Sequence, residues 1–101
     1  MNHQDLGMFS YETRIAGSSY YPDSRYINVN DQLTIQREPT NEYDPNAIKL
    51  LHNRKLVGYV PKDIARELCS KIDLGVFVKV VCTRVGQDIL IKIKGHLFNY
   101  E

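Results

Sequence analysis

The sequence predicts a mostly β protein, a small antiparallel β-barrel of about six strands with one α-helix. Three observations lead to this prediction. Apolar residues alternate with polar ones along several short stretches, as they do in strands that bury one face. One stretch alone repeats its apolar residues every four positions, which is the spacing of a helix face. The chain has 101 residues, of which 43% are hydrophobic, and this suffices for one small core.

The first half of the chain predicts a tail followed by two strands. Residues 1–8 are expected to be a flexible tail, which leaves residues 9–101 as the folded domain. Residues 9–16 are expected to be a strand, because alternate positions hold Phe9, Tyr11, Thr13 and Ile15, which would all face the same side. Gly17 breaks it, and the alternation returns at residues 33–37. Pro39 ends this second strand because proline has no N–H for a ladder.

The second half predicts two hairpins. Residues 47–51 and 56–60 are expected to form a short hairpin around a polar tip. A long antiparallel hairpin is expected from residues 76–83 and 89–94, because both stretches alternate in polarity on either side of a glycine turn. Four cations belong to this hairpin: Lys79, Arg84, Lys92 and Lys94. They indicate either a solvated face of the sheet or a track for phosphates.

A single helix is expected between the hairpins, from Pro61 to Asp73. Proline suits the first turn of a helix, where its missing N–H costs nothing. Ile64, Leu68 and Ile72 form an apolar stripe that should be buried against the final hairpin. A glycine two residues after the predicted end is placed to terminate the helix in the left-handed conformation.

Charge and cysteine content narrow the class of protein. The net charge is +1, but residues 1–44 have three arginines against seven acidic residues (−4), and residues 45–101 have ten basic residues against five acidic ones (+5). This asymmetry permits a basic face for a polyanion. Cys69 and Cys82 are too few for a disulfide framework and are expected to be small core residues in a reduced, cytoplasmic protein.

Several functions are excluded or disfavoured. No apolar run approaches the ~20 residues of a membrane helix, and no signal-peptide pattern is present. The three histidines have no metal-ligand spacing, so neither a metal nor a cofactor is expected. No nucleophile with a base and no Gly-rich phosphate loop are present, so the chain is not expected to be an enzyme.

The most unusual stretch is a polar loop between two prolines, with the sequence Arg37-Glu38-Pro39-Thr40-Asn41-Glu42-Tyr43-Asp44-Pro45-Asn46-Ala47-Ile48. The prolines restrict its backbone, so it should keep one shape. Arg37 and Glu38 are expected either to pair with each other or to fix the loop. Glu38, Pro39, Asn46 and Gly58 are expected to have structural roles.

The sequence resembles the HIRAN domain family, and the resemblance covers nearly the whole chain from Met8. It depends on three motifs: Gly17-x-x-Tyr20-Tyr21, the run from Arg37-Glu38-Pro39 to Asn46-Ala47-Ile48, and Val57-Gly58-Tyr59-Val60-Pro61-x-x-Ile64-Ala65. The resemblance implies a small, stand-alone member with an OB-like or SH3-like barrel. It also implies binding to single-stranded DNA at its 3′-hydroxyl end, a DNA-repair setting, and a helicase or nuclease as partner.

The resemblance also implies six DNA-binding residues: Tyr20, Tyr21, Asn41, Tyr43, Asp44 and Tyr59. The paired tyrosines would stack on the terminal bases, and Asp44 would accept the 3′-hydroxyl. Three features depart from the family pattern. Ser19 replaces an expected basic residue, Tyr59 replaces a histidine of some members, and an aromatic residue expected near the pocket is absent from residues 89–93.

Alternative interpretations remain for each feature. The tyrosine pair can be a packing pair within a loop, and Asp44 can be the cap of a turn. The protein as a whole can be a small barrel that binds another protein without recognising DNA ends. Salt dependence separates these two classes, because binding to phosphates weakens steeply as the salt concentration rises.

Overall fold

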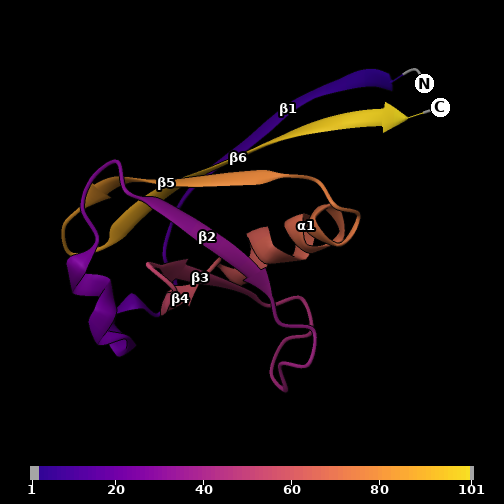
Figure 1. The fold of residues 1–101 in the computed structure, drawn as a ribbon. Helices are drawn as coiled ribbons and strands as arrows, with labels where there is room; N and C mark the ends of the chain where they lie inside the picture. The colour runs from indigo at the N-terminus through magenta and orange to yellow at the C-terminus, as the bar shows by residue number, and fades with distance from the viewer. Residues whose placement is uncertain (1–2, 101) are drawn as a thin grey trace.

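The computed structural model describes the backbone of residues 3–100 and the side chains of residues 7–96. It contains one six-stranded antiparallel sheet in the order β1-β6-β5-β2-β3-β4 and one α-helix, α1 (Figure 1). The elements are β1 (His3–Arg14), β2 (Gln32–Arg37), β3 (Ile48–His52), β4 (Lys55–Tyr59), α1 (Lys62–Asp73), β5 (Val78–Val85) and β6 (Ile89–Tyr100), with short 3₁₀ helices η1 (Ser18–Tyr20) and η2 (Pro22–Tyr26). The predicted mostly β fold with six strands and one helix is confirmed.

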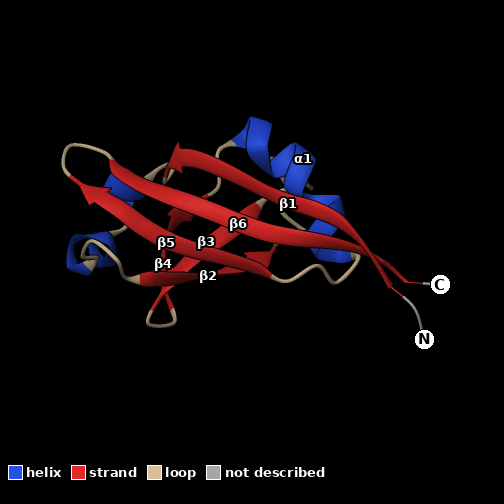
Figure 2. Cartoon of the chain, turned by 90° about the horizontal axis from the view of Figure 1, so that it is seen from above, coloured by secondary structure: helices blue, strands red, loops and turns tan. Residues whose placement is uncertain are grey.

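The sheet curves into a barrel-like shape that no continuous ladder closes. Seen from above, β1, β6 and β5 form a layer across β3 and β4, which run at an angle to it (Figure 2). The two edges meet at a single bridge just beyond β1. Ala16 donates its N–H to the carbonyl of Tyr59 at 2.8 Å, and Tyr59 donates its N–H to the carbonyl of Ala16 at 3.0 Å. This bridge places the segment after β1 against β4.

Gly58 makes this approach of the two edges possible. Its φ is +147°, and a Cβ atom there would overlap Cγ2 of Ile15 and lie 2.7 Å from the carbonyl oxygen of Ala16. Any side chain would push the strands apart. The structural role predicted for Gly58 is thereby confirmed.

The N-terminal boundary differs from the prediction of a tail over residues 1–8. β1 already begins at His3, because β6 continues to Tyr100 and pairs with it in antiparallel register. The two strands extend together beyond the rest of the sheet (Figure 1). A register shift between Asp5 and Gly7 interrupts this ladder. Residues 1–2 lie outside the described part of the chain.

The helix and the core agree with the sequence prediction. Leu68 is fully buried, Ile64 and Ile72 are partly buried, and all three pack in the cluster that contains the inward residues of β5 and β6. Cys69 and Cys82 are buried free thiols of this core. Gly75 has φ +87° and donates to the carbonyl of Ile72 at 2.9 Å, so the helix ends in the predicted left-handed turn. No helix among residues 3–100 is long and apolar enough to cross a membrane.

Candidate functional site

The loop of residues 38–47 is a rigid turn built from its own polar side chains. Oδ1 of Asn41 accepts the N–H groups of Tyr43 at 2.9 Å and Asp44 at 3.0 Å. Oδ1 of Asp44 in turn accepts the N–H of Asn46 at 2.9 Å. Asparagine and aspartate are favoured in such turns because their short side chains can satisfy nearby backbone N–H groups. The loop therefore has a defined shape without any ligand.

Glu38 is the centre of this arrangement. Its Oε1 accepts a hydrogen bond from Nδ2 of Asn41 at 2.5 Å and another from the hydroxyl of Tyr59 at 3.1 Å. Its Oε2 lies 3.0 Å from Nζ of Lys49. These donors favour the charged form, and the hydrogen bond from Asn41, followed by that from Lys49, lowers the pKa of Glu38.

The pKa of the Tyr59 hydroxyl is shifted in the opposite direction, upward. Burial, reinforced by the neighbouring Glu38 carboxylate, raises the pKa of Tyr59 to about 12. The hydroxyl therefore stays protonated at neutral pH and remains a donor to Glu38. It joins β4 to the loop through this hydrogen bond.

Arg37 holds the loop from outside. Its Nη1 donates to the carbonyls of Pro45 at 3.0 Å and Ala47 at 2.9 Å, and its Nε pairs with Asp73 of α1 at 2.9 Å. Of the two expectations for Arg37 and Glu38, fixing the loop is the one the structure supports, since each bonds to other partners. The thiol of Cys69 also donates to Oδ1 of Asn46 at 3.5 Å, which agrees with a structural role for Asn46.

The paired tyrosines lie in the 3₁₀ segment after β1. Gly17 has φ +73°, and a Cβ atom there would lie 3.7 Å from the Tyr20 ring and 3.9 Å from the Tyr21 ring. Ser24 donates from Oγ to the carbonyl of Ser18 at 2.9 Å and fixes the turn. The two rings differ in exposure. Tyr20 is 83% exposed, whereas Tyr21 is half-buried.

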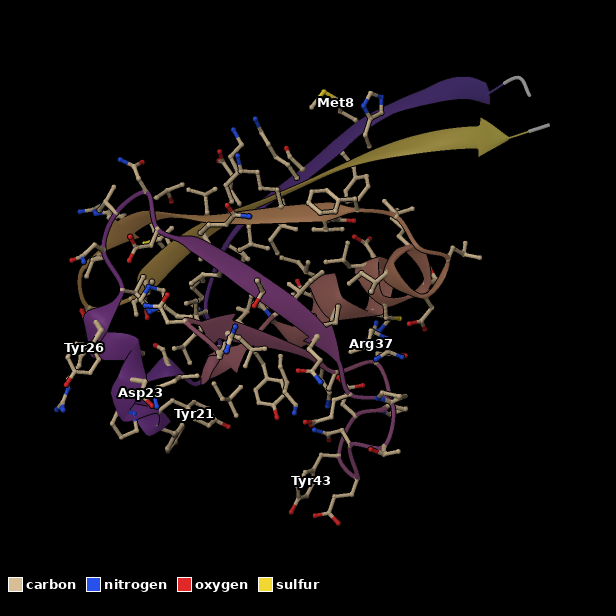
Figure 3. All side chains as sticks on the ribbon, in the orientation of Figure 1. Met8, Tyr21, Asp23, Tyr26, Arg37 and Tyr43 are labelled. Carbon is tan, nitrogen blue, oxygen red and sulfur yellow. The ribbon has the colours of Figure 1, made fainter. Side chains whose placement is uncertain are left out.

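One hollow of about 410 Å³ brings most of the predicted residues together. Its lining contains five of the six predicted binding residues: Tyr21, Asn41, Tyr43, Asp44 and Tyr59. The rings of Tyr21 and Tyr59 lie 6.4 Å apart at 52°. Tyr21 and Tyr43 come from separate segments on the same side of the molecule (Figure 3). Tyr20 does not line the hollow.

Asp44 presents one oxygen to the turn and keeps the other available. Oδ1 caps Asn46, whereas Oδ2 accepts no hydrogen bond within the described residues. The side chain is half-buried and belongs to the hollow. A turn cap and a ligand contact are therefore compatible at this residue.

One contributor was missed by the sequence prediction of the site. Lys62, the first residue of α1, also lines the hollow and supplies a cation beside the tyrosines. The structural role expected for Glu38 agrees with its contacts, although its hydrogen bond with Tyr59 joins distant segments that the sequence did not pair. The position of Lys62 immediately after the Tyr59-Val60-Pro61 motif was the available signal for the cation.

The hairpin cations lie elsewhere. None of Lys79, Arg84, Lys92 and Lys94 lines this hollow. Lys92 lies 3.8 Å from Glu12 on the neighbouring strand. Among the described residues, no group of three or more His, Cys, Asp or Glu side chains is arranged to hold a metal ion.

The fold and the hollow define a class, a small curved β-sheet domain with a tyrosine-rich cleft beside a rigid acidic loop. The chain belongs to the HIRAN domain family, whose sequence profile matches residues 8–98. Helicase-like transcription factor of Mus musculus is 36% identical over 72 residues, which are 69% of this chain and 7% of that protein. A Fanconi-associated nuclease 1 homolog of Arabidopsis thaliana is 29% identical over 96 residues, 76% of this chain and 11% of that protein. The chain thus spans only a small part of these relatives.

Solved structures have the same fold. The HIRAN domain of human HLTF superimposes with a TM-score of 0.75 at 24% identity, covering 98% of this chain and 81% of that one. A protein from Lactobacillus plantarum gives 0.72 at 19% identity, covering 98% of both chains. The HLTF HIRAN domain in its DNA-bound conformation gives 0.65 at 23% identity, covering 99% of this chain and 81% of that one.

Proposed function

We propose that this chain is a non-catalytic DNA-binding module that holds the 3′-hydroxyl end of a single strand in the hollow beside Asp44. The proposal rests on the grouping of three tyrosines, Tyr21, Tyr43 and Tyr59, in one hollow with the carboxylate of Asp44, which has one oxygen without a hydrogen bond within the described residues. A solved HIRAN domain in a DNA-bound conformation supports the general class of ligand. The names of the relatives make a helicase or a nuclease a reasonable partner in DNA repair.

Each group of the hollow has a matching chemical role. Tyr21, backed by Tyr59, offers a face on which an unpaired base can stack. Tyr20 lies outside the hollow and is 83% exposed, so its ring would be accessible to a further base. Base–aromatic stacking contributes ~1–3 kcal/mol per base and requires no particular sequence. Oδ2 of Asp44 would accept the terminal hydroxyl. Lys62 would contact a backbone phosphate and so replace the cation absent at Ser19.

Asp44→Asn is the sharpest test, because asparagine keeps the oxygen that caps Asn46 but loses the charge. We expect fluorescence anisotropy to show that the wild type prefers a strand with a 3′-hydroxyl over a 3′-phosphate and over blunt duplex. The carboxylate repels a terminal phosphate. Removal of the charged hydrogen bond should weaken binding of the hydroxyl end by about 10- to 100-fold, the equivalent of ~1.5–3 kcal/mol. The preference between the two ends should shrink.

Glu42→Gln is the matched control, since Glu42 is exposed on the same loop and does not line the hollow. It should leave both affinities unchanged. A folded Asp44→Asn protein with an unaltered preference between the two ends would refute the role of Asp44. Absence of DNA binding by the wild type, or affinity independent of salt, would favour a protein partner instead.

A further inference from the structure

A second hollow, of about 560 Å³, lies between the connection from α1 to β5 and the paired strands β1 and β6. Met8, which lines this hollow, lies on the opposite side of the molecule from Tyr43 (Figure 3). Its lining includes Met8, Leu74, Val76, Phe77, Lys79 and Lys94. None of them lines the hollow proposed for DNA, so the two surfaces are separate.

This surface exposes large apolar side chains together. Met8 is 69% exposed, Phe77 is 79% exposed and Leu74 is 85% exposed. Single exposed apolar residues are ordinary, but a group around one hollow is typical of an interaction site. The three side chains contribute little to the core and would gain most of their burial from a partner.

The backbone under Leu74 and Phe77 is already ordered. Gly75 and Val76 donate to the carbonyls of Ile72 at 2.9 Å and Lys71 at 3.1 Å, so the turn that carries these side chains is fixed by the end of the helix. Little conformational entropy would be lost in the backbone on binding. The surface is therefore preorganised.

The charged side chains in the described lining of the hollow, Lys79 and Lys94, have one sign. Lys79 and Lys94 lie directly opposite each other in the β5–β6 ladder. Like charges in this position destabilise a sheet, and within the described residues neither lysine forms an ion pair. No acidic residue appears in the described lining of the hollow. A partner with carboxylates would relieve the repulsion between the lysines.

We propose that this surface binds an acidic peptide segment of a partner protein, with an apolar side chain in the hollow and carboxylates beside Lys79 and Lys94. A peptide fits better than a nucleic acid, because two of the three exposed apolar side chains, Met8 and Leu74, are aliphatic, which leaves Phe77 as the one flat face among them for a base. Apolar burial would supply affinity, and the lysines would select for negative charge.

The test is selection of random short peptides against the full chain, followed by anisotropy with the selected peptides. Enriched peptides should combine aspartate or glutamate with a large apolar residue. Phe77→Ser and Lys94→Glu should each weaken their binding by about tenfold or more, as expected for central interface residues. Val29→Ser and Lys55→Glu are the matched controls, because Val29 is 50% exposed and Lys55 is exposed away from the hollow. They should change nothing, and binding of single-stranded DNA should be unaffected by all four variants.

Five results would overturn the proposal. The first two are the enrichment of no peptide and the enrichment only of peptides without acidic residues. The third is binding of the selected peptides to the Phe77 and Lys94 variants as tightly as to the wild type. Self-association that Phe77→Ser abolishes would assign the surface to a second copy of the chain. Loss of DNA binding in Lys94→Glu alone would assign it to nucleic acid. Leu74→Ser replaces Phe77→Ser if melting curves show that the latter variant is unfolded.

Discussion

The loop of residues 38–47 and the 3₁₀ segment of residues 17–26 present tyrosines to the same hollow but are stabilised differently. The loop depends on side chains that converge on the ionised Glu38. The 3₁₀ segment depends on short-range backbone hydrogen bonds, such as those from Tyr20 to Gly17 at 3.0 Å and from Tyr21 to Ser18 at 3.1 Å. One wall of the cleft is therefore sensitive to the protonation of Glu38, whereas the other is sensitive to the backbone conformation of Gly17.

Gly58→Ala should have the largest effect on stability, because it disturbs the bridge between Ala16 and Tyr59, which supports both regions. The new Cβ would overlap Ile15 and separate the bridge between Ala16 and Tyr59. Overpacking and a strained positive φ, at ~1–3 kcal/mol each, predict a loss of about 2–6 kcal/mol in the free energy of unfolding. Denaturant unfolding measures this loss. Gly86→Ala is the control, since nothing closer than 3.9 Å would meet its Cβ; an equal loss there would contradict the packing argument.

Gly17→Ala should disturb the 3₁₀ segment alone. Alanine at φ +73° costs ~1–2 kcal/mol of stability because a Cβ is disfavoured in the left-handed region. Gly75→Ala carries a similar strain at φ +87° with no neighbouring atom within 4 Å, and it lies far from the tyrosines. Thermal melts should show similar losses for both variants. Only Gly17→Ala should weaken binding of single-stranded DNA. Equal binding by the two variants would show that the tyrosine pair does not take part in DNA binding.

Glu38→Gln should weaken the loop and have the smallest effect of the three. The free energy of unfolding should fall by no more than about 1 kcal/mol, since the pair with Lys49 is partly solvated. A glutamate whose folded-state pKa is lowered stabilises the fold above its ordinary pKa of about 4.3. This contribution is lost as the pH falls through the lower folded-state value. The melting temperature, measured at a series of pH values from neutral to below pH ~4, should therefore fall more steeply with decreasing pH for the wild type than for the variant. Parallel curves would show that Glu38 does not link the loop to pH.

Local sequence patterns determined most of the elements and much of the site. Alternation predicted the long final hairpin, and the four-residue spacing predicted the helix, because burial of one face imposes those periods. The two prolines predicted a loop of one shape, and a turn cap was one of the two roles left open for Asp44; the hydrogen bonds that form the turn join neighbours in the chain. The left-handed end of α1 at Gly75 was likewise a local property.

Tertiary structure alone decided how these pieces meet. The pairing of His3 with Tyr100 turned a predicted tail into a strand, and no pattern within residues 1–8 reports a partner at the other end of the chain. The bridge from Ala16 to Tyr59 brought Tyr21 and Lys62 into one hollow and left Tyr20 outside it. The hydrogen bond from Tyr59 to Glu38 joins residues 21 positions apart. Periodicity reports which face of an element is buried, whereas the neighbour against which it is buried depends on how the whole sheet curves.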